Sequence, residues 1–121
     1  MIRRWFTILL FAGVVGCGPK MPPVANADLA REALQVALQS WKQGDKTESL
    51  QERSPPIYFN DEFRRDGQQL VDFEIGNGDR NGMGWRCGAA LTLKQLNGPQ
   101  TQRKVEYQID TDPAIVIVQQ P

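Results

Sequence analysis

The sequence predicts an α+β domain in which an N-terminal helix packs on a curved antiparallel sheet of about four strands. Early in the chain, apolar residues recur at helical spacing, at Leu34, Ala37, Leu38 and Trp41, which indicates an amphipathic helix. Later segments alternate apolar and polar residues, as half-buried strands do. Helices followed by a run of strands are typical of α+β domains.

The first residues have the composition of an export signal. Arg3 and Arg4 precede an uncharged apolar run, Trp5–Val15, which ends at Gly16-Cys17. A basic start, an apolar stretch and a small residue at the cleavage site are the three parts of such a signal. The run is much shorter than the roughly 20 residues that a membrane-spanning helix needs. We therefore expect residues 1–16 to be cleaved from the mature protein.

The end of this signal indicates its type. Val14-Val15-Gly16-Cys17 resembles the lipobox of bacterial lipoproteins. That resemblance implies cleavage between Gly16 and Cys17 and a diacylglycerol on the Cys17 thiol, and two acyl chains suffice for stable anchoring. An ordinary export signal is the alternative, and Arg3-Arg4 also resembles a twin-arginine signal.

The lipobox resemblance places the protein in the cell envelope, held to the membrane through Cys17. Gly18 and Pro19 follow this cysteine without an acidic residue, which favours the outer membrane or the periplasmic face. Residues 17–25 are expected to form a proline-rich tether. Residues 26–121 have the length of a single domain.

Composition limits the chemistry that the chain can perform. It contains no histidine, so histidine-dependent catalytic triads and histidine-ligated metal sites are excluded. The 14 basic residues are matched by 14 acidic ones, a balance that argues against nucleic acid as a partner. We expect no metal and no cofactor. With Cys17 lipidated, Cys87 would be the one remaining thiol, and its place in an apolar strand pattern predicts burial.

Three helical segments are expected before the sheet. The first starts at a cap, Asn26 or Asp28, runs to Lys42 and ends at Gly44, a residue that suits the left-handed position after a helix. A short helix over Thr47–Arg53 would be anchored by Leu50. Asp61–Asp66 can form one helical turn, after a short extended piece at Ile57–Phe59.

The remaining sequence reads as strands joined by turns. Alternating or apolar patterns predict strands, and Asn97-Gly98 and Asp112-Pro113 predict two of the turns. A glycine-rich loop is expected over residues 76–82. The predicted strands are Gln69–Ile75, Met83–Leu96, Arg103–Thr111 and Ile115–Val118. The last is apolar on both faces, so we expect it to be covered or central rather than at an edge.

Two groups of side chains are candidates for function. Asp72 and Glu74 share a predicted sheet face with basic residues; cross-strand ion pairs would explain this, whereas an enclosed face would allow one carboxylate to act as a base. Aromatic residues form the second group, which either seals the core or lines a pocket. The candidate pocket residues are Trp41, Tyr58, Phe59, Phe63 and Trp85. The basic residues that share the predicted sheet face with Asp72 and Glu74 are Arg86, Lys94 and Lys104.

The order of elements resembles the cystatin-like or nuclear-transport-factor-like cone, in which a bent sheet wraps a helix. The resemblance rests on Leu29–Trp41, Ser54–Phe59 and Asp72–Ile75. Cones of this kind serve as isomerases and cyclases and also as non-catalytic dimers and accessory domains. The isomerases use a tyrosine and an aspartate inside the cone. Tyr58 and Tyr107 are present here, but the sequence places neither beside an acid, so no catalytic residue is assigned.

Together these observations predict a lipid-anchored envelope protein whose domain binds a partner without catalysis. The partner would be another envelope protein or a small apolar ligand. One alternative is a small cone-fold enzyme of the isomerase or cyclase type. The other is a structural subunit that forms a homodimer through the outer face of its sheet.

Overall fold

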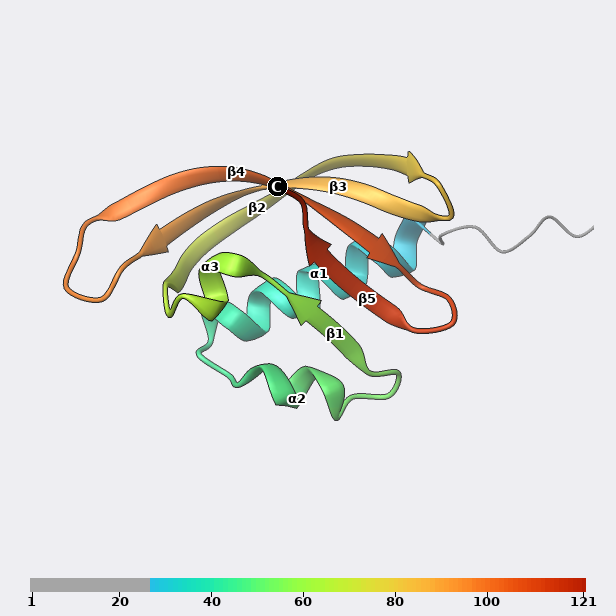
Figure 1. Ribbon diagram of the computed structural model, residues 1–121, viewed down its shortest axis with the longest axis horizontal. Helices are drawn as coiled ribbons and strands as arrows, with labels where there is room; N and C mark the ends of the chain where they lie inside the picture. Colours follow the sequence, from blue (N-terminus) through green and yellow to red (C-terminus); the bar gives the residue numbers. More distant parts are fainter. Residues whose placement is uncertain (1–26) are drawn as a thin grey trace, which may run out of the picture.

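The computed structural model describes residues 27–121, which form one long helix, two short helices and a five-stranded sheet (Figure 1). The predicted signal peptide, the lipidated Cys17 and the tether at residues 17–25 lie outside the described residues. In chain order, the elements are α1 (Ala27–Lys42), α2 (Thr47–Gln51), β1 (Ile57–Asn60), α3 (Glu62–Arg65), β2 (Gln69–Asn81), β3 (Gly84–Lys94), β4 (Gln100–Asp110) and β5 (Ile115–Gln119).

Helix α1 forms where the apolar stripe predicted it. The stripe residues are buried against the sheet, with Leu34 and Leu38 fully inaccessible. Gly44 takes a left-handed φ of 83° just after the helix, which confirms its predicted role as the terminator. At the other end of the helix, Arg31 donates hydrogen bonds to the carbonyl oxygens of Gly76 and Ile75 on β2, at 2.7 and 3.2 Å. The helix is thereby tied to the edge of the sheet.

The sheet is mixed and has five strands, whereas the sequence predicted an antiparallel sheet of about four. The prediction therefore missed one strand and its parallel pairing. The strand order is β1-β5-β4-β3-β2, and β1 pairs in parallel with β5 while all other pairs are antiparallel. The sequence predicted only a short extended piece at Ile57–Phe59, where the structure has the strand β1. Four residues are too few for alternation to distinguish a strand from a loop, and the partner strand lies at the far end of the chain. The pairing does bury β5 between two neighbours, as its apolar sequence predicted.

The predicted glycine-rich loop over residues 76–82 is mostly strand. β2 continues to Asn81, with register irregularities between Leu70 and Asp72 and between Ile75 and Gly78. The second irregularity brings the backbone of Gly78 against the indole of Trp85, where a Cβ atom would collide with the ring. Glycine within a strand often marks such a bulge or close approach. The turn itself is confined to Gly82 and Met83.

The core lies between α1 and the concave side of the sheet. Strands β2, β3 and β4 arch over the helix, and α2 lies beside β1 on the side of the molecule opposite the arched strands (Figure 1). Cys87 is fully buried in this core, as predicted. It lies on the same face of β3 as the buried residues Ala89, Leu91 and Leu93. Across residues 27–121, no helix is long and apolar enough to cross a membrane.

Candidate binding face

The five predicted pocket aromatics do not come together in the structure. Trp41 and Phe59 are buried in the core, with ring centroids 6.3 Å apart, and Phe59 also packs on Tyr107 at 5.8 Å. The indole nitrogen of Trp41 donates to the carbonyl oxygen of Gln68 at 2.9 Å. Trp41 and Phe59 therefore seal one end of the core, which is the simpler of the two interpretations that the sequence allowed.

The other three aromatics lie apart from one another. Tyr58 points outward from β1 and is 45% exposed, while Trp85 is half-buried against the edge of the core. Phe63 is half-buried under the guanidinium of Arg103, 5.7 Å from its ring centroid. None of the surface hollows described below is lined by any of the five.

Tyr107 and Asp61 form a buried hydrogen-bonded pair that the sequence did not predict. The Tyr107 hydroxyl donates to Oδ2 of Asp61 at 2.5 Å, and Oδ1 of Asp61 accepts from the backbone N–H of Arg64 at 3.1 Å. Tyr107 is fully inaccessible and Asp61 is 1% exposed. Desolvation, reinforced by the Asp61 charge and by this hydrogen bond, raises the pKa of Tyr107 far above its ordinary value. The sequence predicted a helical turn at Asp61–Asp66 and a strand that contains Tyr107, but it did not predict that these two residues meet.

This pair serves the fold rather than an accessible site. Asp61 caps α3 while it holds β4, so the contact fastens that helix to the sheet. Arg64, in the same helix, lies over Phe59 at 5.7 Å and donates to the carbonyl oxygen of Asp45 at 2.5 Å. Partial burial lowers the pKa of the Arg64 guanidinium, although nearby carboxylates oppose this effect. Neither Asp61 nor Tyr107 lines the hollows of the outer face described below.

The side of β2, β3 and β4 that faces away from α1 is here called the outer face. It carries the charged residues that the sequence placed on one side of the sheet, together with small residues along β3. A hollow of about 500 Å³ lies at its centre. The residues whose side chains or small size shape the hollow are Glu74, Gly76, Gly88, Ala90, Lys104 and Glu106.

The hollow exists because its floor has almost no side-chain bulk. Gly88 and Ala90 lie on β3, the middle one of the three strands that form the outer face. A Cβ built at Gly88 would meet only the Val105 carbonyl oxygen at 3.7 Å. Two further hollows of about 410 and 310 Å³ share residues with it on either side. The three hollows follow one another along β3 and are together called the trough.

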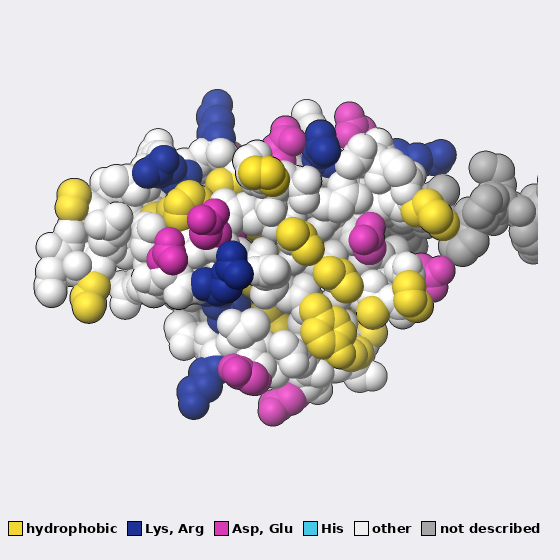
Figure 2. All heavy atoms as spheres, in the orientation of Figure 1, with side chains coloured by type: hydrophobic (Ala, Val, Ile, Leu, Met, Phe, Trp, Pro, Cys, Tyr) yellow, Lys and Arg dark blue, Asp and Glu magenta, His cyan; other side chains and the backbone are white. Residues whose placement is uncertain are grey.

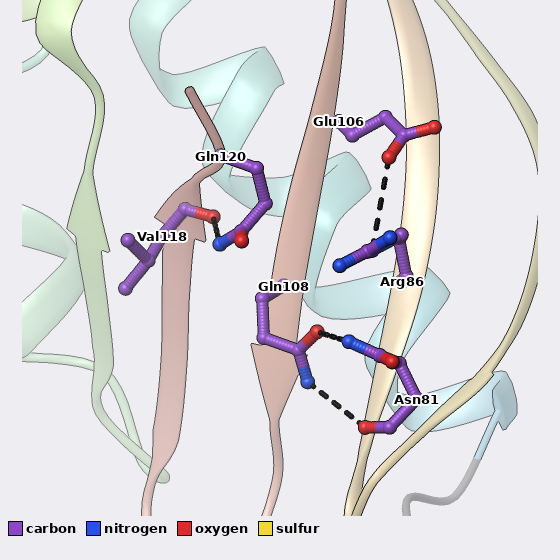
Figure 3. A network of polar contacts seen from close by, with 6 residues as sticks. All are labelled: Asn81, Arg86, Glu106, Gln108, Val118 and Gln120. Carbon is purple, nitrogen blue, oxygen red and sulfur yellow. Dashed lines mark hydrogen bonds and ion pairs between the residues drawn. The ribbon is translucent and has the colours of Figure 1, made fainter.

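One end of the outer face is held by polar contacts between strands (Figure 3). Nε of Arg86 lies 3.7 Å from Oε1 of Glu106. The side-chain amide of Asn81 donates to Oε1 of Gln108 at 2.7 Å, and Nε2 of Gln108 donates to the backbone carbonyl oxygen of Asn81 at 3.3 Å. These contacts join β2, β3 and β4, so this part of the surface is preorganised.

The surface over β1 and β5 differs from the outer face in composition. Hydrophobic side chains gather over β1 and β5 in Figure 2, whereas charged side chains of both signs are spread over the rest of that view. Tyr58 is exposed there, and Val116 and Val118 are half-buried beside it. The molecule thus presents a small apolar strip next to a charged trough.

The acidic residues of the trough are placed for surface contact rather than for proton transfer. Asp72, Glu74 and Glu106 are all exposed, and Asp72 pairs with Lys42 at 3.5 Å in an ion pair open to solvent. Within residues 27–121, no three metal-ligating side chains of the His, Cys, Asp or Glu type gather in one place.

Comparisons of the chain with protein-family models, with curated proteins and with solved structures found no match.

Proposed function

We propose that this chain is a lipid-anchored protein of the cell envelope whose domain binds another protein and performs no catalysis. The lipobox-like Val14–Cys17 supports the anchor, and its position before a proline-rich segment would hold the domain near the membrane. A helix cradled by a curved sheet supports a cystatin-like or cone-like assignment for the domain. The outer membrane, or the periplasmic face of the envelope, is the proposed location.

The outer face carries the argument for binding. Its trough is broad and shallow, it has a floor of small residues, and its rim holds Glu74, Lys104 and Glu106. Charged groups around such a surface contribute specificity and rapid association more than affinity. The trough suits a protein partner better than a small apolar ligand. Ligand pockets enclose most of their ligand, whereas this trough is open.

The cone-enzyme alternative would require an acid and a tyrosine beside a substrate-sized space. Tyr107 and Asp61 have the right chemistry, but both are buried and bonded to one another. A general acid or base must reach the atom whose proton it moves. The non-catalytic proposal is therefore favoured over the isomerase or cyclase alternative.

Photocrosslinking in intact cells tests this proposal. A photoreactive amino acid at Ala90, in the floor of the trough, should join the protein covalently to a protein partner in the envelope. The same amino acid at Glu48, exposed on α2, is the matched control and should give little product. Equal crosslinking at the two positions, or none at Ala90, would remove the outer face as the binding surface.

A further inference from the structure

We infer that the outer face binds a second copy of this chain, with the two sheets face to face about a two-fold axis that runs along β3. The inference depends on the proposed function, because it names the partner of the same surface. It is carried by the arrangement of charged and amide side chains across the three strands, which is self-complementary about that axis.

The strand register places outer-face residues in rows of three, one residue from each strand. Three of these rows have an acidic residue on β2 and a hydrogen-bond donor on β4, with a β3 residue between them. The rows are Asp72–Thr92–Gln102, Glu74–Ala90–Lys104 and Asp79–Arg86–Gln108. In these three rows the acidic residues lie along one side of β3, and the lysine and the two glutamines lie along the other. The remaining outer-face carboxylate, Glu106 on β4, lies 3.7 Å from Nε of Arg86 in its own copy.

A two-fold axis along β3 exchanges these two sides. Glu74 of one copy then faces Lys104 of the second copy, and the reciprocal contact forms at the same time, as in any isologous interface. Asp72 faces Gln102 of the second copy, and Asp79 faces Gln108. The two Glu74–Lys104 contacts thus bring opposite charges together, and complementary charges of this kind fix the register of an interface.

The residues on the axis itself are mostly small. Gly88, Ala90 and Thr92 would meet their own counterparts in the second copy, and their size lets two sheets approach closely. Arg86 is the exception, because it would face a second Arg86. Its guanidinium lies 3.7 Å from the carboxylate of Glu106, which offsets the charge of each copy before the two meet.

The interface would be modest in size. It spans three strands that are spaced about 4.8 Å apart, and interfaces burying less than roughly 1,200 Å² in total are typical of transient contacts. A lipid anchor on each copy would confine both to one membrane and raise their effective concentration. The association is therefore expected in the membrane and should be weak in dilute solution.

Chemical crosslinking of the full-length protein in its own membrane tests the arrangement. Thr92→Cys places a thiol close to the axis, and a short bis-maleimide can span two sheets packed about 10 Å apart. The expected product is a covalent homodimer of twice the chain mass. Glu48→Cys, on the exposed surface of α2, is the control for random collision, and native Cys87 is buried and should not react.

Charge reversal then tests the pairing itself. In the Thr92→Cys background, Glu74→Lys and Lys104→Glu should each reduce the dimer by about tenfold, because each sets like charges opposite one another. Both side chains are exposed, so neither change should unfold the domain. The double variant restores opposite charges and should recover the dimer.

Three outcomes would overturn the inference. The first is the absence of any homodimer from Thr92→Cys, and the second is a failure of the double variant to recover the dimer after both single reversals have reduced it. The third is a Thr92→Cys adduct with a different protein, which would overturn self-association while leaving the proposed binding function in place.

Discussion

Tyr107→Phe is expected to lower the free energy of unfolding by about 2–3 kcal/mol, because it deletes one hydroxyl and leaves the buried carboxylate of Asp61 without that donor. Asp61 is 1% exposed, so water cannot replace the lost hydrogen bond without opening the core. The change removes a single atom and leaves the ring in place against Phe59. Urea denaturation followed by fluorescence measures the effect as a shift in midpoint.

The same variant should also change the response of stability to alkaline pH. A tyrosine in the unfolded chain ionises near pH 10, whereas burial raises the pKa of Tyr107 in the folded protein. The folded protein therefore keeps a proton that the unfolded chain loses. The stabilisation is complete below about pH 10 and is lost as the pH rises further.

Above that pH, the wild-type protein should lose up to about 1.4 kcal/mol per pH unit more than Tyr107→Phe does. Tyr58→Phe, at an exposed position, is the control and should follow the wild type. Parallel stability curves for wild type and Tyr107→Phe would show that Tyr107 is not buried as described.

Leu38→Ala should cost about 3–4 kcal/mol, because Leu38 is fully buried at the contact between α1 and the sheet and its removal leaves a cavity. Gln35→Ala, exposed on the same helix, should change stability by no more than about 0.5 kcal/mol. Denaturation of both variants under the same conditions gives the comparison. A loss below about 1 kcal/mol for Leu38→Ala would contradict the packing of α1 against the sheet.

Local patterns predicted most of the elements of the domain. The stripe that ends at Trp41 predicted α1, and the alternation along β3 and β4 predicted which side chains face the core. Such patterns report whether a residue is buried, and burial follows directly from hydrophobicity. For the same reason, the shared outer face of Asp72, Glu74, Arg86 and Lys104 could be predicted before the structure was known.

Features that depend on distant pairing could not be predicted. Ile57–Asn60 became a strand because it pairs with Ile115–Val118, and nothing within the segment indicates that partner. The contact between Asp61 and Tyr107 joins α3 to β4 and has the same origin. Residues 76–81 resemble a loop in composition, yet their glycines allow a bulged strand to pass beneath Trp85.

The central claim, that the domain is held to a membrane by a lipid on Cys17, is tested most directly by the intact mass of the mature protein isolated from its native membrane. The account predicts a chain that begins at Cys17 and carries a diacylglycerol, with the modification absent from a Cys17→Ser version. A mass corresponding to an unlipidated chain, or to one that retains residues 1–16, would contradict the anchor and the envelope assignment that depends on it.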